Sequence, residues 1–113
     1  MFSALTNTIK FNSQNEQSNP IIGQLLADTG ALPAGRYVCW VLLTTSAAGT
    51  FLVNHRNADD DATEDFVYLQ VPANDSRQFV LAFALEENER LTVTPLVDLT
   101  ANVTVSIVHQ RLS

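Results

Sequence analysis

The fold is decided by the stretch Tyr37-Val38-Cys39-Trp40-Val41-Leu42-Leu43, the centre of the longest apolar run in the chain. β-Branched and aromatic residues favour a strand, and Gly35 and Gly49 flank the run as glycines commonly flank strands. A buried helix is the competing interpretation. Because both alternating sets of side chains are apolar, we expect a strand covered on both faces, by an opposing sheet and by a second cover such as another subunit.

The rest of the chain repeats this pattern, with short apolar runs separated by clusters of Gly, Pro, Asn, Asp and Ser. Strands are expected at residues 5–11, 21–27, 36–44, 48–54, 66–71, 77–85, 90–95 and 101–112. The polar run 12–19 is typical of a loop or an extended arm. In residues 77–85 the alternation places Phe79, Leu81 and Phe83 inward.

These observations predict an all-β protein: a single-domain, two-sheet antiparallel sandwich of about eight strands, jelly-roll-like, with a short N-terminal arm. Residues 1–19 form the N-terminal strand or arm and the polar loop, and residues 20–113 form the sandwich. Periodicity does not give the strand order, so an immunoglobulin-like sandwich remains an alternative.

Composition limits the partners that the chain can bind. Only 16% of the 113 residues are charged, against about 25% in typical domains, as expected of a protein that assembles with copies of itself or with a partner. The net charge is −6, and the six Lys and Arg residues are scattered, which argues against nucleic acid. No apolar run is long enough to span a membrane, and the N-terminus lacks the order of a signal peptide.

The best candidate for a cation site is the acidic loop that contains Asp59, Asp61 and Glu64, because hard cations bind several carboxylates on a flexible loop. The loop matches no EF-hand, and the adjacent residues Asp59, Asp60 and Asp61 cannot all point at one ion in an extended chain. A solvated acidic loop is the favoured interpretation. We expect no cofactor.

The sequence offers no candidate nucleophile for a catalytic site. His55 lies before the acidic loop, but Cys39 is expected to be buried and no serine lies in a Gly-x-Ser-x-Gly motif. We therefore expect no enzymatic activity. His55 is expected to cap a strand end, Arg56 to pair with a loop carboxylate, and His109 to be half-buried in the last strand.

The aromatic residues give two hypotheses about binding. Tyr37, Trp40 and Tyr68 could together form a platform on which sugars stack, although aromatic residues in strands mostly fill cores. Phe2 and Phe11 flank an N-terminal segment that could dock on a neighbouring subunit, and core filling is an equal alternative for Phe11. The candidate contacts with other proteins are Phe2, Leu5, Phe11 and Trp40.

Several strand and turn segments in the C-terminal two-thirds of the sequence resemble those of small β-sandwich proteins of tailed bacteriophage particles. In particular, the chain resembles the capsid cement, or decoration, proteins that have a jelly-roll fold. The resemblance covers roughly residues 32–112 and lies in residues 32–37, 51–57, 71–79 and 85–93. Similar segments occur in the tips of tail fibres.

The resemblance implies a non-enzymatic virion protein, made in the host cytoplasm, that binds the outer capsid surface and bridges neighbouring major capsid proteins. It also implies association with itself, as a dimer or a trimer. The alternative is a receptor-binding or glycan-binding head of a phage tail fibre or spike.

Overall fold

The computed structural model describes residues 10–113, with side chains from residue 17 onward. These residues form eight strands: β1 (Lys10–Ser18), β2 (Ala27–Asp28), β3 (Gly35–Thr45), β4 (Gly49–Arg56), β5 (Ala62–Val71), β6 (Asp75–Leu85), β7 (Arg90–Pro95) and β8 (Asn102–Arg111). No helix occurs among the described residues. The all-β prediction is therefore confirmed, and the helical alternative for the central run is wrong.

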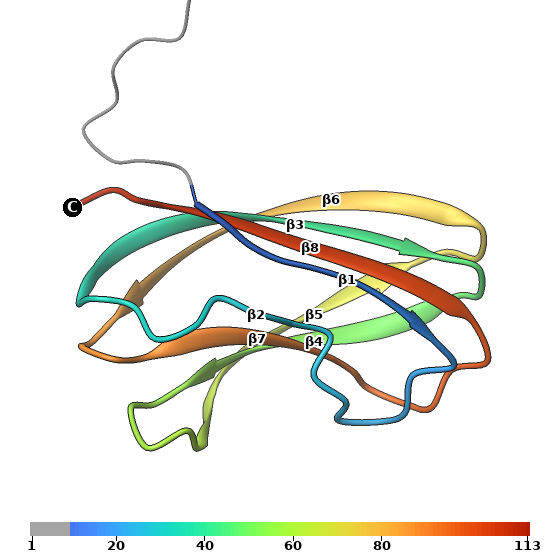
Figure 1. Ribbon diagram of the computed structural model, residues 1–113, viewed down its shortest axis with the longest axis horizontal. Coiled ribbons are helices and arrows are strands. Elements are labelled where there is room, and N and C mark those ends of the chain that lie inside the picture. Colours follow the sequence, from blue (N-terminus) through green and yellow to red (C-terminus); the bar gives the residue numbers. More distant parts are fainter. Residues whose placement is uncertain (1–9) are drawn as a thin grey trace, which may run out of the picture.

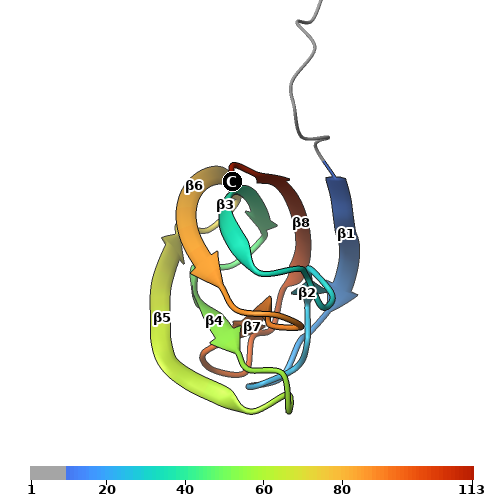
Figure 2. The same ribbon diagram turned by 90° about the vertical axis from the view of Figure 1, so that its left-hand side faces the viewer.

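The strands form two four-stranded antiparallel sheets that pack face to face (Figures 1 and 2). The first sheet has the order β1-β8-β3-β6 and the second the order β2-β7-β4-β5. Each pair is nested inside the next along the chain: β4 pairs with β5, β3 with β6, β2 with β7 and β1 with β8. This nesting is a long hairpin rolled into two layers, the jelly-roll arrangement, and it differs from the immunoglobulin order.

The core lies between the two sheets and is built from the inward half of each alternating strand. Strand β3 contributes Tyr37, Cys39, Val41 and Leu43, all at most 2% exposed. Phe51 of β4 lies opposite, and the expected inward residues Phe79, Leu81 and Phe83 of β6 pack against this core. The alternation therefore identified the buried face of β6 correctly, whereas in β3, apolar on both faces, only the structure shows which face enters the core.

Two expectations about the N-terminal part were wrong. The polar run 12–19 lies mostly in β1, which pairs with β8 at the edge of the first sheet, because backbone pairing does not require apolar side chains at an edge. The run 21–27 is loop except for Ala27, the first residue of the two-residue strand β2. There Ile21, Ile22 and Leu25 are exposed at 59%, 62% and 48%.

The buried thiol of Cys39 gives a first prediction. Burial raises the pKa of this thiol to about 12, so almost no thiolate forms in mildly alkaline buffer. We expect the native protein not to react with Ellman's reagent under those conditions, and the denatured protein to release one equivalent of thionitrobenzoate. Rapid reaction of the native protein would contradict the buried position of Cys39.

Candidate functional site

The outer face of the first sheet carries an apolar surface centred on Trp40. Trp40 lies opposite Val80 of β6 and Val108 of β8, and residues directly opposite in antiparallel strands share a face. Leu42 and Val80 are 43% and 60% exposed, and Trp40 and Val108 are half-buried. We call this surface the Trp40 patch; it comprises Val38, Trp40, Leu42, Val80, Ala82 and Val108.

The rim of the Trp40 patch is polar, and it includes the exposed Arg36 at one end, on the same face of β3 as Val38. Gln78 and Ser106 lie on either side of Leu42, and Gln110 lies beside Val38. An apolar centre with a rim of amides and hydroxyls is the common anatomy of a protein interface. The expectation that a second cover lies over β3 stays a prediction, since only the inner face of β3 is covered in this structure.

The remaining interface candidates lie at the N-terminal end. Phe2 and Leu5 lie outside the described residues. The backbone of Phe11 pairs with Val108 at the edge of the Trp40 patch, but its side chain also lies outside the described part. Of the candidate interface residues, Trp40 is therefore the one whose side chain the structure places.

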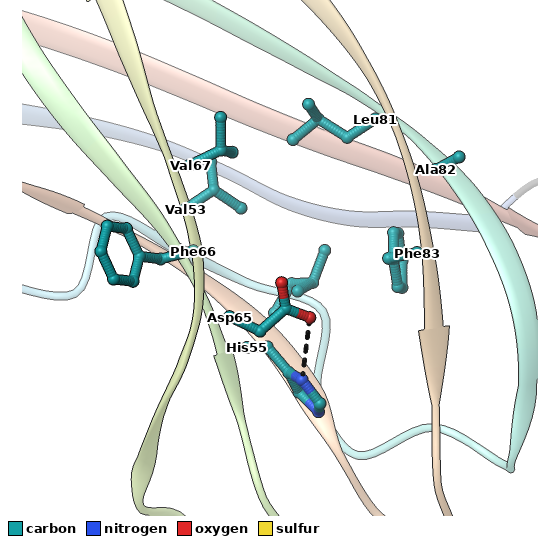
Figure 3. Close-up of a pocket in the computed structure, with 9 residues that line it drawn as sticks. Val53, His55, Asp65, Phe66, Val67, Leu81, Ala82 and Phe83 are labelled. Carbon is teal, nitrogen blue, oxygen red and sulfur yellow. Dashed lines mark ion pairs between the residues drawn. The ribbon is translucent and has the colours of Figure 1, made fainter.

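A cavity of about 160 Å³ opens between the edge strands β5 and β6 (Figure 3). Its wall is apolar except at one end, where His55 and Asp65 lie together. Phe66 points away from the other lining side chains. The lining consists of Val53, His55, Asp65, Phe66, Val67, Leu81, Ala82, Phe83 and Leu91. This set includes no hydroxyl or thiol nucleophile.

His55 is held between two carboxylates. Its Nε2 lies 2.8 Å from Oε1 of Glu89, and its Nδ1 lies 3.4 Å from Oδ2 of Asp65. Glu89 is buried and also accepts a hydrogen bond from the backbone N–H of Glu86, at 2.7 Å. That bond, together with His55, holds the pKa of Glu89 below its ordinary value. The arrangement ties the end of β4 to the turn between β6 and β7. The partners of the His55 ring are carboxylates, so the expected capping of a strand end by His55 stays a prediction.

The Glu89 contacts predict a pH-dependent loss of stability. Because its folded pKa lies below the ordinary value of 4.5, the stabilisation is complete above that value and is lost as the pH falls through the folded pKa. We expect Glu89→Gln to lower the free energy of unfolding at neutral pH by about 1–3 kcal/mol. Urea denaturation should show this difference shrinking in acid; a difference that is constant with pH would contradict the assignment.

The acidic loop is held by arginines. Arg56 donates from Nε to Oδ1 of Asp60 at 2.8 Å, as the sequence led us to expect, and Arg90 binds the same carboxylate. These hydrogen bonds, that from Arg56 first, lower the pKa of Asp60. Arg90 also pairs with Asp28, at 3.1 Å. The Asp60 carboxylate, which both arginines bind, therefore has a structural role in holding the loop.

The weak metal candidates Asp59, Asp61 and Glu64 are all exposed. Asn57 shapes this turn, because its side-chain oxygen accepts hydrogen bonds from the backbone N–H groups of Asp59 and Asp61. Across residues 10–113, no group of three or more histidine, cysteine or carboxylate side chains could hold a metal ion. The same residues include no helix long and apolar enough to cross a membrane.

The three aromatic residues proposed as one sugar platform do not lie together, so that hypothesis is wrong. Tyr37 is buried, donates its hydroxyl to the carbonyl of Pro33 at 2.6 Å and stacks on Phe83. Trp40 lies on the outer face of the first sheet and Tyr68 on that of the second. His109, expected to be half-buried, is buried at 5% exposure, and its ring meets that of Tyr37 edge-on.

An aromatic pair that the sequence analysis missed lies on the second sheet. Phe66 and Tyr68 alternate along β5 and are 48% and 52% exposed, with ring centroids 5.3 Å apart. The signal was present in the sequence, since two aromatic residues separated by one position lie on the same face of a strand. We call them the Phe66–Tyr68 pair.

Comparisons with known proteins identify the fold. No protein-family model and no curated protein matches the chain. Among solved structures, the N-terminal CBM22-1 and GH10 modules of xylanase Xyn10B from Clostridium thermocellum, complexed with xylohexaose, match with a TM-score of 0.64 and 13% identity. The match covers 98% of this chain and 25% of that one. This chain therefore spans about a quarter of the xylanase structure.

Two phage proteins match over nearly the whole of this chain. The enzymatically active domain of tailspike protein 4 of bacteriophage CBA120 has a TM-score of 0.56 and 8% identity, with coverage of 95% of this chain and 19% of that one. The PRD1 vertex protein P5 has a TM-score of 0.53 and 9% identity, with 95% of each chain covered. The chain shares their β-sandwich fold. At these identities the likeness concerns the fold alone.

Proposed function

We propose that the protein is a non-enzymatic virion structural protein that binds the outside of a phage capsid and stabilises contacts between major capsid proteins. The observation that carries this proposal is the Trp40 patch, an apolar sheet face with a polar rim. The fold shared with two phage proteins and the resemblance to cement proteins support it. We place the protein on the outer capsid surface after its synthesis in the host cytoplasm.

The physical basis of cementing is preferential binding to the assembled shell. A protein that binds only where major capsid proteins meet shifts the equilibrium toward the assembled state. Burial of the Trp40 patch provides the favourable free energy, about 25 cal/mol for each Å² of apolar surface removed from water. Association with itself, as a dimer or a trimer, and contacts through the N-terminal arm with Phe2, Leu5 and Phe11 add further surface.

Thermal rupture of capsids tests the proposal. DNA-filled capsids that lack the protein are purified and heated with and without added protein, and DNA release is followed with a dye. We expect added protein to raise the rupture temperature, because bound copies oppose separation of the capsid subunits. Equal rupture temperatures at saturating protein would overturn the proposal.

The Phe66–Tyr68 pair favours a second candidate function, that of a receptor- or glycan-binding head of a tail fibre or spike. Exposed aromatic side chains are suited to binding because each presents an apolar ring, and Tyr68 adds a hydroxyl. This candidate requires the protein to be part of the tail. Its presence on tailless capsids would favour cementing, and its absence there would favour the tail.

A further inference from the structure

We propose that the outer face of the second sheet carries a binding site for an uncharged oligosaccharide. The Phe66–Tyr68 pair forms its stacking surface, and a neighbouring polar groove supplies its hydrogen bonds. This inference rests on the second candidate function, glycan binding, and specifies the residues and the class of ligand for it. It is distinct from the Trp40 patch, because the two lie on opposite outer faces of the sandwich.

The stacking surface is solvent-exposed on the edge strand β5. The two rings are inclined by 49°, so together they form a bent surface instead of one flat plane. The C–H face of a pyranose ring packs against an aromatic ring while its hydroxyls remain free for hydrogen bonds. Two inclined aromatic rings can each bind one sugar of an oligosaccharide whose linked sugars are inclined in the same way.

The strand register continues this surface across the sheet. Phe66 lies opposite Asn54 of β4, which in turn lies opposite Thr92 of β7. Asn54 and Thr92 are only 5% and 2% exposed, so the accessible row is the one that starts at Tyr68. Tyr68 is followed in the same way by Leu52 and then Thr94. Two strand spacings, about 10 Å, separate Tyr68 from Thr94, a span suited to a short oligosaccharide.

A groove of about 210 Å³ lies at the threonine end of this surface. Its lining includes Leu25, Arg56, Asp60, Arg90, Thr92 and Thr94. The part-exposed Thr94 hydroxyl and the charged groups provide both donors and acceptors, as the hydroxyls of a sugar require. The Thr92 hydroxyl is buried and donates to the backbone carbonyl of Asn54, so it belongs to the wall of the groove.

The charges in the groove indicate an uncharged ligand. Asp60 binds both arginines, and Arg90 also pairs with Asp28. The two guanidinium groups are thus balanced by two carboxylates, so no unpaired cation remains to attract a sulfate, phosphate or carboxylate group. The ion pairs also hold the polar groups in place before the ligand binds, which reduces the entropic cost of binding.

Labelled protein on an array of uncharged and anionic oligosaccharides tests the site. We expect saturable binding to uncharged members. Titration calorimetry with the strongest soluble oligosaccharide should show Phe66→Ala and Tyr68→Ala each binding about tenfold more weakly, by analogy with the loss of one aromatic ring that stacks on a nucleotide base. Trp40→Ala is the matched control on the opposite face and should bind normally. Circular dichroism checks that every variant is folded.

Three results would overturn the site: no binding on the array, binding restricted to anionic members, or binding unaffected by both Phe66→Ala and Tyr68→Ala. Binding lost in Trp40→Ala but retained in both β5 variants would preserve a glycan-binding function and overturn this location for it. The same variants are tested for co-sedimentation with capsids, the readout of the cementing proposal. Any capsid binding by the wild-type protein should persist in Phe66→Ala and Tyr68→Ala, because both residues lie on the sheet opposite the Trp40 patch. Failure of the oligosaccharide site and failure of cementing are therefore distinguishable.

Discussion

Replacing Phe51 with alanine is expected to lower the free energy of unfolding by about 3–5 kcal/mol, the largest effect of any single truncation considered. Phe51 is 0% exposed and lies between the two sheets. Truncation removes the transfer free energy of the ring and leaves a cavity that two packed sheets cannot close. Domains of this size are stable by only about 5–15 kcal/mol, so guanidinium denaturation should show a greatly lowered midpoint.

Phe66→Ala is the matched control for this prediction, because it removes the same side chain from an exposed position on the neighbouring strand. Phe66 is 48% exposed, and its truncation should cost less than about 1 kcal/mol, as expected of surface substitutions. If both variants lost the same stability, the placement of Phe51 in the core and Phe66 on the surface would be wrong.

Replacing Trp40 with alanine is expected to weaken capsid binding by at least about thirtyfold. Tryptophan near the centre of an interface typically contributes 2 kcal/mol or more by truncation, roughly this factor in affinity. Trp40 lies between Val80 and Val108 and beside exposed Leu42, so its indole forms the middle of the surface that would be buried. Co-sedimentation with capsids over a range of protein concentrations measures the loss.

Two further variants make this prediction specific. Leu42→Ser changes the same face without removing the indole and should also weaken binding, since it places a hydroxyl in the apolar centre. Tyr68→Ala changes the opposite sheet and should bind capsids normally. Wild-type affinity in both Trp40→Ala and Leu42→Ser would show that the Trp40 patch is not the contact surface.

Local pattern was sufficient to predict the strands in which alternation coincides with burial. In β6 every second side chain enters the core, so hydrophobic periodicity identified both the strand and its inner face. In β3 both faces are apolar, so composition identified the strand but not the face that enters the core. Local pattern failed for β1, whose Asn, Gln and Ser residues form an edge strand through backbone pairing with β8. The strand order depends on contacts between distant parts of the chain, which periodicity does not contain.

The contacts at the candidate sites also differ in how far they could be predicted: those between residues close in sequence could be, and those between distant residues could not. The Arg56–Asp60 pair was predictable because the two residues are four positions apart on one turn. The contact between His55 and Glu89 joins residues 34 positions apart and depends on β4 lying beside β7. Likewise, separating Trp40 from Tyr68 required knowledge of which sheet each strand joins, and this separation distinguishes the proposed capsid contact from the proposed oligosaccharide site.

The most direct measurement of the proposed cementing role is the number of copies in each purified particle, obtained by quantitative mass spectrometry of whole phage and of tailless capsids. A cement protein should be present in a fixed ratio to the major capsid protein, and that ratio should be the same in both preparations. A few copies in whole phage and none in tailless capsids would contradict the capsid role and assign the protein to the tail.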